Sequence, residues 1–89
     1  MKSIQFLVKG KVQGVGYRMF TRSVARRLNI CGWVRNEPDG TVSGSAKGDT
    51  IDIDKFLEAL KIGPPVSVVE GVDFFEEADR DYVGFEVRF

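Results

Sequence analysis

The chain has 89 residues, enough for one domain with a modest core but too few for a deep internal cavity, so a site should lie at a sheet edge or loop. Its 13 basic and 13 acidic side chains cancel, which excludes an overall field that would attract nucleic acid or an anionic membrane. Histidine is absent, and this excludes Ser-His-Asp and Cys-His triads and the commonest zinc and iron ligands.

The composition also bears on where the protein works. No segment approaches the length of apolar chain needed to span a bilayer, and a single cysteine cannot form an internal disulfide. We therefore expect a cytoplasmic protein in a reducing compartment. The cysteine, Cys31, fits a small buried side chain better than a nucleophile.

The first third of the chain predicts a strand followed by a helix. Apolar residues at every second position from Ile4 to Val8 indicate a strand with one apolar face that ends near Val12. From about Tyr17 to Leu28 the apolar period becomes helical. Arg18, Arg22 and Arg26 form a basic stripe on that helix, and the last two fit its solvent-facing side.

A hairpin comes next. Residues 31–36 resume a strand, and the turn sequence Pro38-Asp39-Gly40 predicts that residues 41–47 return antiparallel to it. One face of the returning strand carries only Val42, Gly44 and Ala46, which would let a helix pack closely.

The remainder predicts a second helix and two further strands. The helix begins after Asp49, a plausible N-cap, and ends at Gly63 before two prolines. A strand follows from about Ser67 to Glu76, and alternation from Val83 to Phe89 indicates a short last strand.

The order βαββαβ plus a terminal strand predicts an α+β protein, a single domain over residues 1–89. The expected fold is a ferredoxin-like split β-α-β sandwich, an antiparallel sheet with two helices on one face. Right-handed crossovers make the first two strands parallel, with the third antiparallel between them. The first two strands then end at the same edge of the sheet, about 10 Å apart.

Gly10 to Arg18 has the composition of an anion cradle. Gly14 and Gly16 permit backbone amides to converge, the following helix aims its free N–H groups at the same space, and Arg18 supplies a planar fork of donors. The dinucleotide pattern is excluded because Met19 stands where a third glycine is required. The stretch by itself fits equally a tight strand-to-helix turn with Arg18 in solvent.

Asn36 ends the second strand at the same edge. By alternation it shares a face with Val34, which should be buried under a helix, so its side chain should point towards the cradle. An Asx-type cap at the entry of the hairpin is an equally good interpretation of Asn36.

Two stretches in register resemble the acylphosphatase signatures. Gly10 to Arg18 is similar to the first, and Gly32 to Asn36 with Asp39 to Val42 is similar to the second. The resemblance covers essentially the whole chain. It implies a small cytosolic enzyme that hydrolyses carboxyl-phosphate mixed anhydrides to a carboxylate and inorganic phosphate, without metal or cofactor.

The resemblance also implies roles for residues. The phosphate-binding arginine matches Arg18, and the asparagine that places the attacking water matches Asn36. The loop whose amides surround the phosphate matches residues that run from strand to helix: Gln13, Gly14, Val15, Gly16 and Tyr17. After Val42, where the family often has a glutamate or another long polar residue, this chain has Ser43 and Ser45, which bears on substrate contacts.

The expected ligands are a small acyl phosphate and, in its place, phosphate or sulfate. We expect a monomer that binds neither nucleic acid nor membrane. The alternative is a non-catalytic module of this fold that binds phosphate or RNA. RNA readers of this topology present aromatic side chains on central strands, where this chain has Gln5, Leu7, Ser43 and Ser45.

Overall fold

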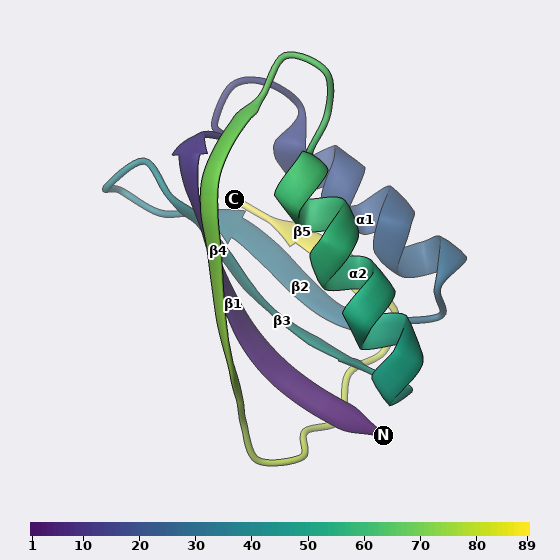
Figure 1. Ribbon diagram of the computed structural model, residues 1–89. Helices are drawn as coiled ribbons and strands as arrows, with labels where there is room; N and C mark the ends of the chain where they lie inside the picture. Colours follow the sequence, from purple (N-terminus) through teal and green to yellow (C-terminus); the bar gives the residue numbers. More distant parts are fainter.

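Five strands and two helices follow one another in the predicted order (Figure 1). The computed structural model describes all residues from 1 to 89. Along the chain the elements are β1 (Lys2–Lys11), α1 (Tyr17–Arg27), β2 (Cys31–Asn36), β3 (Val42–Gly48), α2 (Thr50–Ile62), β4 (Val68–Glu76) and β5 (Phe85–Arg88). Neither helix is long and apolar enough to cross a membrane.

The sheet confirms the predicted topology. Its strand order is β4-β1-β3-β2-β5, and β3 lies antiparallel between β1 and β2. The one departure from an antiparallel sheet is β5, which runs parallel to β2. The reason is that β4 ends where β1 begins, and residues 77–84 then cross that end of the sheet, so β5 starts beside the start of β2.

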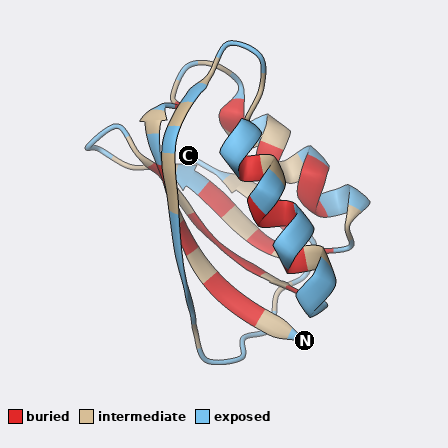
Figure 2. Ribbon diagram, in the orientation of Figure 1, coloured by how far each residue is buried: buried red, intermediate tan, exposed pale blue.

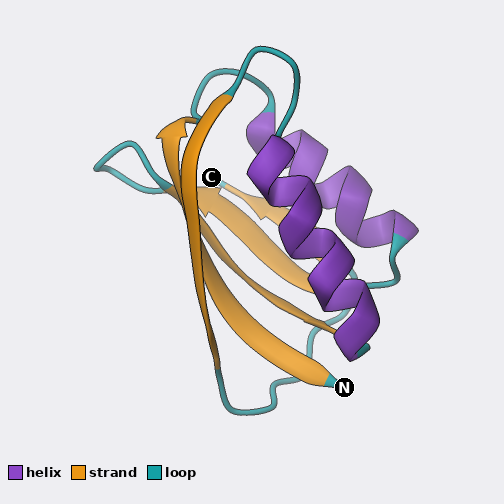
Figure 3. Cartoon of the chain, in the orientation of Figure 1, coloured by secondary structure: helices purple, strands orange, loops and turns teal.

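Both helices cover one face of the sheet (Figure 3). The core of 16 buried apolar residues lies between them and includes the inward-facing residues Ile4, Phe6 and Val8 of β1. The ring of Phe56 on α2 packs edge-on against Phe6 at 5.4 Å between centroids and against Phe85 at 6.1 Å. Figure 2 shows the buried residues on the facing sides of helices and sheet.

Local details differ from the sequence expectation at three places. Gly84 has a φ of 67°, in the left-handed region, so β5 begins after it rather than at Val83. Asp49 occupies the N-cap position of α2 with extended backbone, but its side chain makes no capping hydrogen bond. Cys31 is half-buried rather than buried, because it alternates with Gly32 and lies on the face opposite the helices.

The small residues of β3 make room for an aromatic ring. A Cβ atom placed on Gly44 would lie 2.5 Å from Cζ of Phe6 and would also strike the backbone carbonyl oxygen of Trp33. The ring of Phe6 therefore occupies the space above Gly44 and reaches α2 through Phe56.

We predict that Gly44→Ala lowers the free energy of unfolding by about 2–3 kcal/mol, since the added methyl group overpacks the sheet and its backbone neighbour cannot move away. Gly71→Ala is the matched control, because a Cβ there has no neighbour within 4 Å and φ is ordinary. Urea denaturation of both variants measures the difference. Equal stability of the two variants would contradict the packing assigned to Gly44.

Candidate active site

The loop between β1 and α1 turns through two glycines in the left-handed conformation. Gly14 has a φ of 73° and Gly16, the N-cap of α1, a φ of 78°. Side-chain-bearing residues adopt this conformation only at a cost, so the two glycines explain how the chain leaves β1 and enters α1 in five residues. Val12 and Tyr17 anchor the two ends of the loop, each 1% exposed.

The backbone N–H groups of this loop have no acceptor within the protein. None of the hydrogen bonds outside regular elements is donated by the backbone of residues 13–19, and the first one of α1 runs from Phe20 N to Gly16 O at 3.0 Å. Free N–H groups and the positive end of the helix dipole thus face the same region. Such a terminus attracts anions.

Arg18 has no acidic partner. No carboxylate lies within 4 Å of its guanidinium, in contrast to Lys9, Arg35, Lys47 and Arg88, which are all paired. Its Nη1 donates to the carbonyl oxygen of Arg88 at 3.0 Å, and its Cζ lies 4.7 Å from the ring centre of Phe89. These contacts orient the side chain without neutralising its charge.

Asn36 ends β2 on the helix-facing side, as alternation with Val34 predicts. Its Oδ1 atom is buried and has no hydrogen-bond partner. The side chain that caps the hairpin is instead Asp39, whose Oδ1 accepts from the backbone N of Thr41 at 3.0 Å and from its hydroxyl at 2.6 Å. The side-chain Oδ1 of Asn36 is therefore free to accept a hydrogen bond from a bound molecule.

A pocket of about 100 Å³ joins these groups, and its lining consists of Val12, Gly14, Gly16, Tyr17, Arg18, Met19 and Asn36. Gln13 and Val15, also expected at the site, do not line it, and Val15 packs against the core. Met19 was not predicted. A cavity of about 10–15 Å³ already holds a water molecule, so a phosphoryl group has room here.

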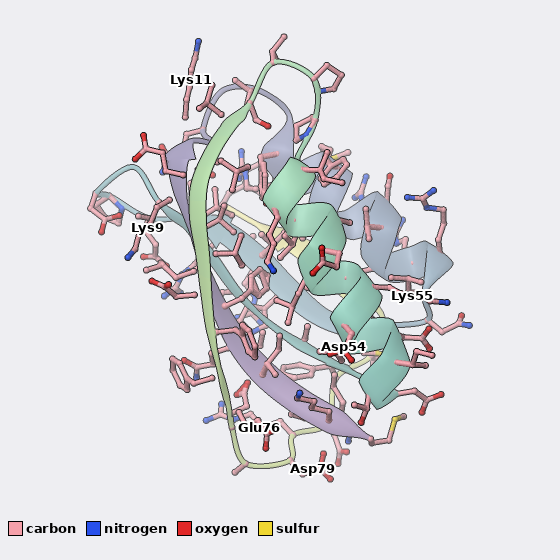
Figure 4. The ribbon with its side chains drawn as sticks, in the orientation of Figure 1. Lys9, Lys11, Asp54, Lys55, Glu76 and Asp79 are labelled. Carbon is pink, nitrogen blue, oxygen red and sulfur yellow. The ribbon has the colours of Figure 1, made fainter.

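A larger pocket of about 410 Å³ lies at the other end of β1 and is acidic, with Glu76, Glu77 and Asp79 in its lining. Figure 4 shows Lys11, at the end of β1, far from Glu76 and Asp79. Three carboxylates against one lysine make this pocket unsuited to an anion. No group of three or more Asp, Glu, Cys or His residues could hold a metal ion.

The side chain of Gln13 points away from the pocket and ties the loop to the hairpin. Its Nε2 donates to the carbonyl oxygens of Glu37, at 2.7 Å, and Thr41, at 2.9 Å. Those two residues also close the hairpin, through a bond from Glu37 N to Thr41 O of 2.8 Å. Because Glu37 follows Asn36, Gln13 couples the loop to the strand that carries Asn36.

Two further hydroxyl groups near the site are engaged elsewhere. The Tyr17 hydroxyl donates to the carbonyl oxygen of Leu60 at 2.6 Å, and burial raises its pKa, so the phenol stays protonated at neutral pH. Ser43 donates to the carboxylate of Glu37, and this bond, followed by the one from Arg35, lowers the pKa of Glu37. Neither Ser43 nor Ser45 lines the pocket.

We predict that Gln13→Ala loosens the hairpin and speeds hydrogen exchange of the Glu37 amide about fivefold, because a net hydrogen bond contributes about 1 kcal/mol. Gln5→Ala is the control, since the side chain of Gln5 makes no hydrogen bond. Exchange measured by NMR on both variants tests this. An unchanged exchange rate at Glu37 in Gln13→Ala would show that the side chain does not hold the hairpin.

The family model and the relatives that match this sequence all carry the same family name. The acylphosphatase family model matches residues 4–87. The acylphosphatase of Archaeoglobus fulgidus is 47% identical over 89 residues, covering all of both chains. That of Methanocella arvoryzae is 48% identical over 88 residues, covering 99% of this chain and all of the relative.

The same family appears among solved structures. The crystal structure of an acylphosphatase from Bacillus subtilis matches with a TM-score of 0.96 and 33% identity, and the match covers all of both chains. The similarity in sequence and in structure thus spans the whole fold, including the glycine loop and the hairpin. The chain therefore belongs to the acylphosphatase family and is an enzyme that hydrolyses acyl phosphates.

Proposed function

We propose that Arg18 and the backbone amides of residues 13–17 bind the phosphoryl group of an acyl phosphate, and that Asn36 orients the water that attacks it. The observation that carries this proposal is the buried, unpaired Oδ1 of Asn36 in the same small pocket as the unpaired guanidinium of Arg18. The pocket thus contains an acceptor for a hydrogen bond from water, Asn36 Oδ1, and a cation that can bind phosphate, Arg18. Buried polar atoms without partners are rare, which favours a ligand at this position.

The phosphoryl group would be held by charge and by shape. Free N–H groups at the glycine loop surround its equatorial oxygens, and the fork of Arg18 supplies two parallel donors. In the transition state negative charge is spread over these three equatorial oxygens, and donors fixed at their positions stabilise it. The glycines matter because a side chain at either position would strain the left-handed backbone.

The reaction needs little help with proton transfer. The oxygen of the bound water attacks phosphorus, and the bond between phosphorus and the acyl oxygen breaks with its electron pair going to the carboxylate. The conjugate acid of that leaving group has a pKa of about 4, so the carboxylate needs no proton at neutral pH. Asn36 is an amide and cannot act as a base, so the proton of the water passes to the phosphate itself. A chain without histidine can therefore carry out this reaction.

We also propose that the reaction proceeds without a metal ion, in a cytoplasmic monomer that does not bind nucleic acid. Absence of RNA binding is supported by the open face of β1 and β3, which carries Gln5, Leu7, Ser43 and Ser45 where RNA readers of this topology present aromatic side chains.

We expect Arg18→Lys to lower the rate of phosphate release from benzoyl phosphate by about 30- to 1,000-fold, since an ammonium cannot reproduce the fork; this corresponds to about 2–4 kcal/mol in the barrier. Arg22→Lys, one turn further along α1, is the matched control. The assay is run in EDTA, so that turnover by the wild type also demonstrates independence of divalent metal. A folded Arg18→Lys variant with the wild-type rate would refute the role of Arg18.

For Asn36→Ala we expect turnover to fall by about 100-fold or more, because an unoriented water attacks poorly. The inhibition constant of inorganic phosphate should change by less than about threefold, because the groups that hold phosphate are intact. Steady-state kinetics with phosphate as inhibitor gives both numbers. Parallel loss of turnover and phosphate affinity would instead make Asn36 part of the phosphate-binding group.

A further inference from the structure

Met19 is an exposed apolar side chain at the mouth of the active-site pocket. It lines the pocket beside Arg18 and is 50% exposed, whereas the other apolar residues of the lining, Val12 and Tyr17, are each 1% exposed. A half-exposed methionine of this size has no role in the core, because it belongs neither to the buried cluster nor to the residues packed against it. A molecule bound in the pocket would cover the exposed side chain of Met19, and this would explain why an apolar residue lies there.

The size of the pocket determines where the acyl group must lie. About 100 Å³ suffices for the phosphoryl group and the attacking water, and the acyl group has to extend out through the mouth. The exposed members of the lining are Gly14, Gly16 and Met19, so they form that mouth. The two glycines have no side chain, and a Cβ built on either meets nothing within 4 Å. Met19 is thus the one exposed side chain that a departing acyl group meets.

We propose that Met19 is the contact surface for the acyl group, and that the enzyme prefers acyl phosphates whose acyl group is apolar and, above all, aromatic. This inference rests on the proposed binding of the phosphoryl group by Arg18 and the loop. The methionine side chain is flexible and polarisable and makes favourable contacts between its sulfur and aromatic rings. An aromatic acyl group leaning on Met19 would also remove apolar surface of both from water.

Charged acyl groups find no counterpart other than Arg18 among the residues that line the pocket. The nearest lysine along the chain, Lys11, does not line the pocket, and Figure 4 shows its side chain pointing away from the body of the molecule. The charge of Arg18 is directed at the phosphoryl group in the proposed mode. The lining contains no second cation that would recognise a carboxylate or phosphate on the acyl side.

The test compares kcat/KM for benzoyl phosphate, acetyl phosphate and succinyl phosphate in the wild type and three variants. Met19→Gln keeps the length of the side chain but makes it polar, and Met19→Leu keeps it apolar. Ile51→Gln is the matched control, because Ile51 is an exposed apolar residue, 65% exposed, in the first turn of the other helix. Leucine and glutamine are both good helix formers, so α1 should be retained.

We expect the ratio of kcat/KM for benzoyl phosphate to that for acetyl phosphate to fall about three- to tenfold in Met19→Gln. Met19→Leu should keep the ratio within about twofold of the wild type, and Ile51→Gln should not change it. The loss should appear in KM more than in kcat, because contact with the acyl group is made in the bound substrate as well as in the transition state.

Two results would overturn the inference while leaving the proposed function standing. One is an unchanged ratio in a Met19→Gln variant that hydrolyses both substrates, and the other is a wild-type preference for succinyl over benzoyl phosphate. Failure of the wild type to hydrolyse any of the three would reject the proposed function first, and the inference with it.

Discussion

The active site depends on one constraint of the sheet: β3 lies between β1 and β2 and is antiparallel to both. Val42 of β3 pairs with Val8 on one side and with Asn36 on the other, so Asn36 lies level with Val8 two strands away. That separation is about 10 Å. β1 continues past Val8 to Lys11, and the glycine loop follows it at the same edge of the sheet. Gln13 joins that loop to the hairpin through its two hydrogen bonds. A slip of one residue between β2 and β3 would turn Asn36 to the opposite face, away from the pocket.

Because the chain has no net charge, attraction for an anion has to be local. It arises because carboxylates pair with several basic side chains but not with Arg18. Lys9 pairs with Asp73 at 2.7 Å and Lys47 with Asp79 at 2.7 Å, so the charges of these two lysines are compensated by neighbouring carboxylates. Arg18 alone stands beside free backbone N–H groups with no carboxylate in reach. A neutral protein thus holds a small positive site, while acidic side chains gather at the far end of β1.

Local periodicity sufficed to predict the elements, and the handedness of crossovers sufficed to predict that Arg18 and Asn36 share an edge. Alternation also predicts the face of Asn36, but the directions of side chains in and next to the loop could not be predicted from it. Periodicity does not predict that the side-chain amide of Gln13 donates to carbonyl oxygens 24 and 28 residues further along the chain. Met19 looked like a missing glycine in a dinucleotide motif, and only the pocket shows it at the mouth. The parallel pairing of β5 follows from the path of residues 77–84, which carries no periodic pattern.

β5, the shortest strand, ends at Arg88, which contacts the side chain of Arg18. Free arginine side chains lose considerable rotamer entropy when an anion immobilises them. In this fold the side chain of Arg18 is already restrained by the protein itself, because it donates to the carbonyl oxygen of Arg88 and lies over the ring of Phe89. Arg88 in turn stacks on Trp33 of β2, its neighbour in the sheet. The hydrogen bond between residues 70 positions apart thus links the last strand, only four residues long, to the arginine proposed to bind the phosphoryl group.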